Sequence, residues 1–165
     1  MKNKSINMLI VAFLLIALTA VMLIVFLDTS KDEFPKKITV SENGVTESVL
    51  PTRDLRLNPT ESREYCVNLI CAASGKYEIT LDYEEKLDGG MKPFIEVTVK
   101  ADGKTVYEGG LLELLDSDKT ISFEGELHEK KPLPITISYH MPRDVGNEAQ
   151  RTYSDFNVHL KIKKV

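Results

Sequence analysis

Apolar and polar residues alternate along most of the chain after residue 37. Segment 76–83 (KYEITLDY) is the clearest case, with two tyrosines, an isoleucine and a leucine on one face and four polar side chains on the other. Successive side chains of a β-strand point to opposite faces, so this pattern predicts a half-buried strand. The same alternation predicts strands around 65–71, 95–100, 121–123, 135–141 and 156–162.

Residues typical of tight turns separate these strands and indicate which of them form hairpins. Asp102-Gly103 supplies the positive backbone dihedrals of a two-residue hairpin, and Asn43-Gly44 gives the same signal earlier in the chain. Segment 111–116 (LLELLD) is the one helical candidate after residue 37, long enough for a turn or two at an open end of the fold. Roughly eight to ten short strands predict an all-β domain, an antiparallel sandwich of two sheets with a jelly-roll or immunoglobulin-like topology.

A run of apolar residues, Met8–Leu27, precedes the strand pattern and carries no charge and a single hydroxyl, Thr19. As a helix this run is about 30 Å long, which matches the hydrocarbon thickness of a bilayer. We therefore expect a single N-terminal transmembrane helix. The side chains expected to anchor it in lipid include Met8, Leu9, Ile10, Phe13, Leu14, Leu15, Leu23, Phe26 and Leu27.

A cleaved secretory signal is the alternative for this run, because Lys2 and Lys4 form a basic start. Signal peptides have apolar stretches of roughly 7 to 15 residues that end in small residues, and segment 27–30 (LDTS) does not fit that ending. The two lysines also favour a cytoplasmic N-terminus. We expect four parts: a cytoplasmic tail at 1–7, the anchor at 8–27, a charged spacer at 28–37 and an extracellular sandwich domain at 38–165.

The charge balance argues against a nucleic-acid partner. The chain holds 21 basic and 25 acidic residues, a net charge of −4, and the excess of acidic residues is larger once Lys2 and Lys4 are set aside. Binding to nucleic acid needs clustered lysine and arginine to neutralise phosphate. The acidic excess is typical of a solvated surface.

The two cysteines, Cys66 and Cys71, lie five residues apart in one predicted strand. A continuous strand would separate their α-carbons by about 16 Å, beyond the roughly 7 Å limit for a disulfide. Cys71 falls on the apolar face and is expected to be buried, whereas Cys66 falls on the polar face. A disulfide between two copies through Cys66 is the functional alternative.

No catalytic motif emerges from the sequence. His128-Glu129 begins like a zinc-peptidase helix, but Pro132 stands where the second histidine would be needed. His140 and His159 occupy polar positions of two strands and would approach each other only if those strands paired. We therefore expect a protein that is not an enzyme and carries no resident cofactor, with a metal-dependent peptidase as the least favoured alternative.

The polar connection 141–154 (MPRDVGNEAQRTYS) is the most distinctive loop. Asp144, Asn147 and Glu148 offer oxygen ligands that Ca²⁺ prefers, although their spacing is not that of an EF-hand. The alternative is a loop whose side chains hydrogen-bond locally. Because loops commonly carry contacts with partners, we expect binding to occur here.

At this loop the chain resembles the TasA and camelysin group of exported Gram-positive bacterial proteins. Gly146, Asn147, Glu148 and Gln150 are similar to a Gly-Asn-Glu-x-Gln motif that precedes a final strand, which here contains Phe156. Segment 57–62 (LNPTES) is similar to the Leu-x-Pro-Gly-x-Ser segment that leads into an early core strand of that group. The chain departs from that group at one position near each motif. Thr60 stands where the first turn usually has glycine, and Arg151 stands where glycine usually follows the glutamine.

The resemblance implies a jelly-roll sandwich at the cell surface, with fibre formation in TasA and a metalloprotease activity in camelysin. In that group an N-terminal segment is thought to complete a sheet of the next subunit, and segment 38–40 (ITV) is the matching candidate here. We expect a membrane-anchored surface or matrix protein acting in binding or assembly, with the bilayer, itself or other surface proteins as partners. The alternatives are a secreted fibre subunit and an anchored module that binds polysaccharide or protein.

Overall fold

The computed structural model describes residues 35–42, 45–117 and 119–165 of the chain. The chain divides into two units near residue 33, and the description below concerns the second unit alone. Its strands are β1 (Lys37–Val40), β2 (Val45–Leu55), β3 (Ser62–Cys71), β4 (Gly75–Gly89), β5 (Glu96–Ala101), β6 (Lys104–Gly110), β7 (Ile121–Leu127), β8 (Leu133–His140) and β9 (Tyr153–Lys164). The short helices are η1 (Lys92–Phe94), α2 (Leu111–Asp116) and η2 (Asn147–Ala149).

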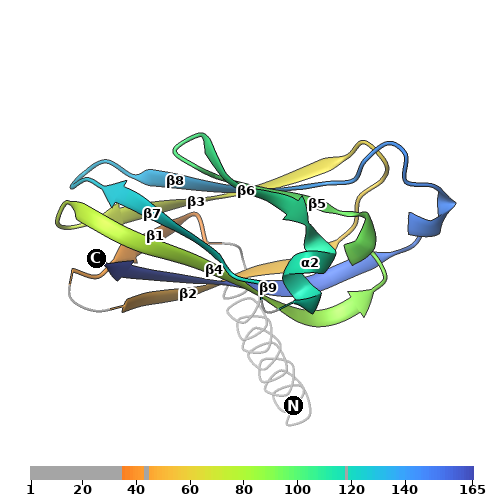
Figure 1. The fold of residues 1–165 in the computed structure, drawn as a ribbon, viewed down its shortest axis with the longest axis horizontal. Helices are drawn as coiled ribbons and strands as arrows, with labels where there is room; N and C mark the ends of the chain where they lie inside the picture. The colour runs from red at the N-terminus through yellow and green to blue at the C-terminus, as the bar shows by residue number, and fades with distance from the viewer. Residues whose placement is uncertain (1–34, 43–44, 118) are drawn as a thin grey trace, which may run out of the picture. The chain divides into compact units, whose positions relative to one another are not determined.

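The strands form two sheets stacked face to face (Figure 1), which confirms the predicted sandwich. One sheet has the order β1-β3-β8-β5-β6 and the other β2-β9-β4-β7. The antiparallel pairs are nested in sequence, since β5 pairs with β6, β4 with β7, β3 with β8 and β2 with β9. Such a set of nested pairs rolled into two sheets is the topology of a jelly roll, not of an immunoglobulin fold.

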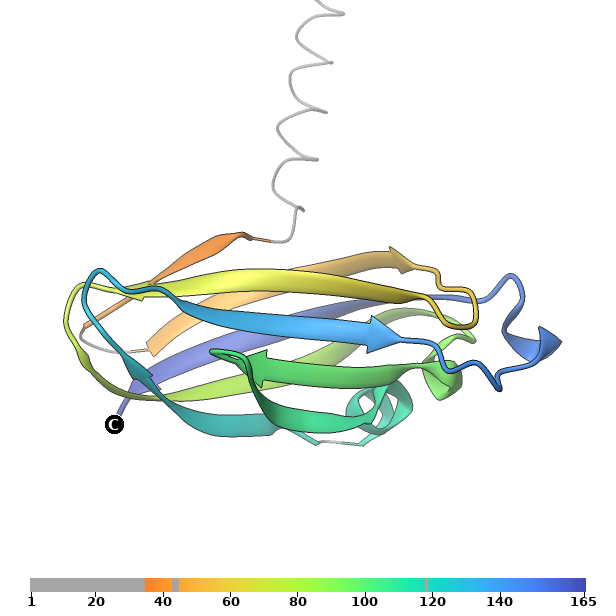
Figure 2. The same cartoon turned by 90° about the horizontal axis from the view of Figure 1, so that it is seen from above.

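One strand departs from the predicted antiparallel arrangement. β1 lies at the edge of the five-stranded sheet and pairs in parallel with β3, from Lys37 beside Asn68 to Val40 beside Cys71. Figure 2 shows β1 beside β3 at that edge. Alternation along β1 places Ile38 and Val40 in the core, so this short strand is held by two buried side chains as well as by its backbone.

The core lies between the sheets and follows the alternation of the sequence. In β4 the side chains of Tyr77, Ile79 and Leu81 are fully buried, as the pattern predicts. In β9 Phe156 contacts the ring of Tyr139 from the opposite sheet at a centroid distance of 5.3 Å, in an edge-to-face arrangement. Aromatic side chains therefore tie the two layers together.

Two predicted local features are confirmed within the described residues. Asp102 and Gly103 have positive φ values of 47° and 76° and join β5 to β6 as a tight hairpin. The predicted helical turns at Leu111–Asp116 form α2, which buries Leu111 and Leu114. The other hairpin signal, Asn43-Gly44, lies outside the described residues.

The predicted membrane anchor, residues 8–27, and the tail before it also lie outside the described residues. No helix within segments 35–42, 45–117 and 119–165 is long and apolar enough to cross a bilayer.

Candidate functional site

Two connections meet at one end of the sandwich, the loop between β2 and β3 and the loop between β8 and β9 (Figure 1). The backbone N–H of Thr60 donates to the carbonyl of Met141 at 2.8 Å, and the N–H of Met141 donates to the carbonyl of Glu61 at 3.0 Å. A concavity of about 480 Å³ lies between these loops. Its volume is within the range of small-molecule sites.

The first wall of the concavity is the turn Asn58–Glu61. The N–H of Glu61 donates to the carbonyl of Asn58 at 2.9 Å, Pro59 occupies the second position, and Thr60 has a φ of 74°. Proline second and a positive φ third define a type II turn. The Glu61 carboxylate accepts hydrogen bonds from the side-chain amide and backbone N–H of Asn58, both at 2.9 Å, which lowers the pKa of Glu61.

The second wall is the turn Ala149–Thr152, which has the same geometry. Gln150 has φ −66° and ψ 131°, Arg151 has a φ of 64°, and the N–H of Thr152 donates to the carbonyl of Ala149 at 3.3 Å. These values again define a type II turn. A third residue with a positive φ lies nearby, because Asp54 has a φ of 46° at the bulge where β2 changes register against β9.

The positive side chains of this concavity are Arg56 and Arg151. Arg56 lies over the ring of Tyr153 at 5.4 Å from its centroid, and its Nε donates to the Asp54 carboxylate at 2.6 Å. Arg151 is exposed. The remaining polar lining comes mainly from the amides of Asn58, Asn147 and Gln150.

The Ca²⁺ candidates of the long loop do not share one concavity. Asn147 lines the concavity between the turns, whereas Asp144 lines a different one beside β5 and β6. The side-chain oxygen of Asn147 accepts a hydrogen bond from the Gln150 amide at 2.8 Å. Within the described residues no group of three or more His, Cys, Asp or Glu side chains is placed to hold a metal ion. The geometry of Asn147 and Gln150 favours the locally hydrogen-bonded loop.

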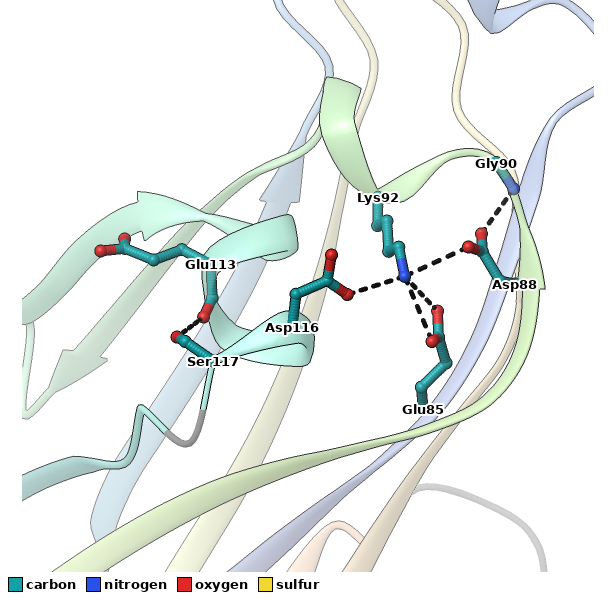
Figure 3. A network of polar contacts seen from close by, with 7 residues as sticks. All are labelled: Glu85, Asp88, Gly90, Lys92, Glu113, Asp116 and Ser117. Carbon is teal, nitrogen blue, oxygen red and sulfur yellow. Dashed lines mark hydrogen bonds and ion pairs between the residues drawn. The ribbon is translucent and has the colours of Figure 1, made fainter.

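A network of ion pairs is centred on Lys92 (Figure 3). It lies near the end of β4, where Gly90 forms a bridge with Tyr153 at the start of β9. The Lys92 ammonium contacts the carboxylates of Glu85 at 3.1 Å, Asp88 at 3.1 Å and Asp116 at 2.8 Å, and these contacts raise the pKa of Lys92. Asp88 also accepts the backbone N–H of Gly90 at 2.7 Å, which together with Lys92 lowers the pKa of Asp88. One side chain thereby connects β4, η1 and α2.

The cysteines lie as the sequence predicts, with Cys66 exposed, Cys71 buried and both thiols free. Cys66 is at the outer face of the five-stranded sheet, opposite Thr136 of β8. A disulfide between copies through Cys66 stays a prediction.

The two strand histidines do not approach each other through strand pairing, because β8 and β9 belong to different sheets. His140 is hydrogen-bonded through Nδ1 to the Ser62 hydroxyl at 2.9 Å. His159 is hydrogen-bonded through Nε2 to Glu84 at 2.8 Å, and this contact, after the larger effect of Lys86, lowers the pKa of Glu84 to about 2.

Several residues of the site carry no sequence signal of their own. Arg56 comes directly after the end of β2, and Lys92 comes two positions after Gly90. Neither position belongs to a recognisable motif. The partners of Lys92 come from segments up to 24 residues away in the chain. Thr60 and Arg151 did carry a signal, because each departs from a glycine expected by resemblance.

Comparison with known families and proteins does not identify the chain. No family model matches it, and no curated protein matches it. Solved structures do match, and among them is the C-terminal domain of EclA, a sugar-binding protein, with 17% identity, a TM-score of 0.38, and coverage of 76% of this chain and 83% of that chain.

Two further solved structures have comparable scores. A family 35 carbohydrate-binding module from Clostridium thermocellum is 9% identical, with a TM-score of 0.35 and coverage of 73% of this chain and 92% of that chain. PliG of Aeromonas hydrophila, a periplasmic inhibitor of g-type lysozyme, is 12% identical, with a TM-score of 0.33 and coverage of 79% of this chain and 99% of that chain. At these scores the matches do not assign a family or a function to the chain.

Proposed function

We propose that this chain is a non-enzymatic, membrane-anchored module of the cell surface that binds a ligand through the loops at one end of its jelly roll. The membrane attachment in this proposal rests on the apolar run at residues 8–27. The binding role rests on the concavity between the turns Asn58–Glu61 and Ala149–Thr152.

The observation that carries the proposal is the construction of this concavity. Each wall is a tight turn closed by its own hydrogen bond, and the first turn is linked to the start of the second loop through Met141. Rigid walls favour binding because little conformational entropy is lost when a ligand is held. Three residues near this end, Asp54, Thr60 and Arg151, have positive φ values that cost free energy, and such strain is concentrated at functional sites.

The resemblance to the TasA and camelysin group supports the cell-surface part of the proposal. Thr60 and Arg151 stand where that group usually has glycine, and both adopt the left-handed conformation that glycine prefers. A backbone conformation that suits glycine is what the resemblance predicts at these two positions.

A binding assay on the purified full-length chain tests the proposed function. The chain, kept in detergent micelles, is incubated with insoluble cell-wall and matrix polysaccharide, and the bound fraction is measured after sedimentation. We expect retention that is lost when Asn147 and Arg151 are both replaced by glycine. Retention should persist in a Lys104→Ala variant, which alters a concavity at another part of the molecule. Equal retention of the parent chain, the double glycine variant and Lys104→Ala would show that this concavity is not the binding site.

Assembly through β1 is a second candidate function, favoured by the position of that strand. β1 is four residues long, lies at a sheet edge and, among the described residues, pairs with β3 alone. A strand of this kind can pair with β3 of its own chain or with β3 of a neighbouring copy. In an anchored protein, exchange of β1 would link copies on the same membrane.

A designed disulfide separates the two pairings. Thr39 of β1 lies beside Ile70 of β3 in the register, so a Thr39→Cys, Ile70→Cys variant in a Cys66→Ser background should form a bridge between them. If β1 is exchanged, oxidation gives covalent dimers and higher species on a non-reducing gel. If β1 stays with its own chain, oxidation gives a cross-linked monomer, and the assembly role is refuted. The single Thr39→Cys variant is the control for random oxidation.

A further inference from the structure

The concavity between the two type II turns differs in charge from the rest of the molecule. The chain has a net charge of −4, yet the residues described as lining this concavity include Arg56 and Arg151 and no carboxylate. The two other described concavities each include three carboxylates, among them Glu124 in one and Glu108 in the other. Arg56 is ion-paired with the Asp54 carboxylate at 2.6 Å, so the positive charge that is not paired within the described residues is that of Arg151. A local positive charge on an acidic surface attracts an anionic group.

The two guanidinium groups retain free donors. Arg56 uses Nε for Asp54 and lies against Tyr153, and within the described residues its terminal nitrogens have no hydrogen-bond partner. Arg151 has none there either. A guanidinium presents paired N–H donors that match the two oxygens of a carboxylate. The positive φ of Arg151 fixes the backbone from which this side chain extends.

The amide side chains add a mixture of donors and acceptors. The Gln150 amide nitrogen donates to the Asn147 side-chain oxygen. In the part of the chain that the structure describes, the Asn147 amide nitrogen and the Gln150 side-chain oxygen have no partner. The amide nitrogen of Asn58 donates to Glu61, and its side-chain oxygen has no hydrogen-bond partner among the described residues. Hydroxyl groups both donate and accept, and they are satisfied by such a mixture. Leu57, Pro59 and Val145 supply apolar lining beside these polar groups.

We propose that this concavity binds an acidic sugar residue of a polysaccharide, with its carboxylate at Arg151 and Arg56 and its hydroxyls at Asn58, Asn147 and Gln150. This inference rests on the proposed binding function and names its ligand class. The lining of amides and guanidinium groups favours a hydroxylated anion over a peptide, whose main chain is more commonly recognised along a sheet edge. Its volume of about 480 Å³ accommodates one or two sugar rings.

Titration with a matched pair of oligosaccharides tests the inference. The probes are trigalacturonic acid and its methyl ester, which has the same rings and hydroxyls but no negative charge. Calorimetry on the full-length chain in detergent should show binding of the acid that weakens as salt is added. The ester should bind about tenfold more weakly or worse, as expected when a charge-assisted hydrogen bond is lost.

Two arginine variants locate the binding site. Arg151→Gly removes the guanidinium and also relieves the positive φ, so the fold should be kept while affinity for the acid falls about tenfold or more. Arg143→Gly is the matched control, because Arg143 is exposed in the same connection but does not line the concavity. Its affinity should equal that of the parent chain.

The outcomes separate this inference from the proposed function. Equal affinity for acid and ester, or an unchanged affinity in Arg151→Gly, overturns the acidic-sugar assignment. If cell-wall retention in the sedimentation assay still depends on Asn147 and Arg151, the binding function stands with a different ligand. No binding of either oligosaccharide overturns the inference, and loss of retention at the same time would overturn the binding function as well.

Discussion

At the scale of single residues, the most informative positions are those where a side chain occupies a backbone conformation that suits glycine. Thr60 is the extreme case, because a β-branched residue at a φ of 74° brings its Cβ and Cγ close to the backbone. Arg151 adopts a similar φ of 64° without branching. Both are held by the hydrogen bond that closes a type II turn.

Replacing Thr60 by glycine should stabilise the protein. The left-handed conformation costs a residue with a Cβ about 1–2 kcal/mol, and glycine loses about 0.5–1 kcal/mol more backbone entropy on folding. We expect a net gain of about 0.5–1 kcal/mol in the free energy of unfolding, measured by urea denaturation. Thr105→Gly is the matched control, because Thr105 is an exposed residue of β6 with ordinary backbone geometry. That substitution should destabilise, and a loss at both positions would show that Thr60 is not strained.

At the scale of elements, Lys92 determines how the helical segments attach to the sandwich. Its side chain is only 13% exposed, while its partners Glu85, Asp88 and Asp116 are 29%, 43% and 50% exposed. α2 is six residues long and lacks a side-chain hydrogen bond at its N-cap. A helix this short depends on contacts outside itself, so the ion pair to Asp116 and the buried leucines of α2 hold it in place.

Replacing Lys92 by methionine should therefore loosen η1 and α2. The substitution keeps the length of the side chain but leaves three carboxylates without their shared cation. We expect a loss of about 1–2 kcal/mol in the free energy of unfolding, because the partners are partly exposed and their interaction is screened. Hydrogen exchange should increase most at segment 111–116.

Lys86→Met provides the control for this substitution. Lys86 pairs with Glu84, and both side chains are about half exposed. Pairs of this kind contribute little to stability. A loss as large as that of Lys92→Met would argue that charge in general, and not the network of Figure 3, supports these elements.

At the scale of the whole molecule, the two sheets are joined by a core that includes tyrosine hydroxyls. The hydroxyls of Tyr83 and Tyr139 are buried, and no described group accepts a hydrogen bond from them in good geometry. Burial is the main reason that the pKa of each is raised above its usual value of 10. Each sheet contributes one of these residues, Tyr83 from β4 and Tyr139 from β8. Ionisation of either hydroxyl would therefore weaken the contact between the two sheets.

Stability should consequently fall as the pH rises above about 10. In the unfolded chain Tyr83 and Tyr139 lose their protons near pH 10, whereas in the folded protein they keep them to higher pH. The unfolded state then binds fewer protons than the folded state, which lowers the free energy of unfolding with each further step in pH. Urea denaturation at about pH 8 to pH 11, a range that spans the usual tyrosine pKa of about 10, should show the free energy of unfolding falling as the pH rises.

A double Tyr83→Phe, Tyr139→Phe variant should reduce that slope, because neither phenylalanine can ionise. The aromatic contacts of both rings with Phe156 are kept, so the variant should fold at neutral pH. An unchanged slope would assign the alkaline loss to other groups.

The strands and their buried faces could be predicted because a strand alternates its side chains with a period of two. Tyr77, Ile79 and Leu81 in β4, the helical turns of α2 and the Asp102-Gly103 hairpin all follow from local pattern. The burial of Cys71 and the exposure of Cys66 follow from the same period. These features depend on neighbouring residues in the chain, which is why the sequence alone contains them.

The tertiary structure alone decided which strands are partners and which loops meet. The sequence predicted a sandwich but left jelly-roll and immunoglobulin-like orders open, and it did not predict the parallel pairing of β1. The concavity lined by Arg56 and Arg151 and the network at Lys92 join residues that are distant in the chain. Long-range pairing depends on how whole faces pack against each other, and the local alternation of residues does not encode that choice.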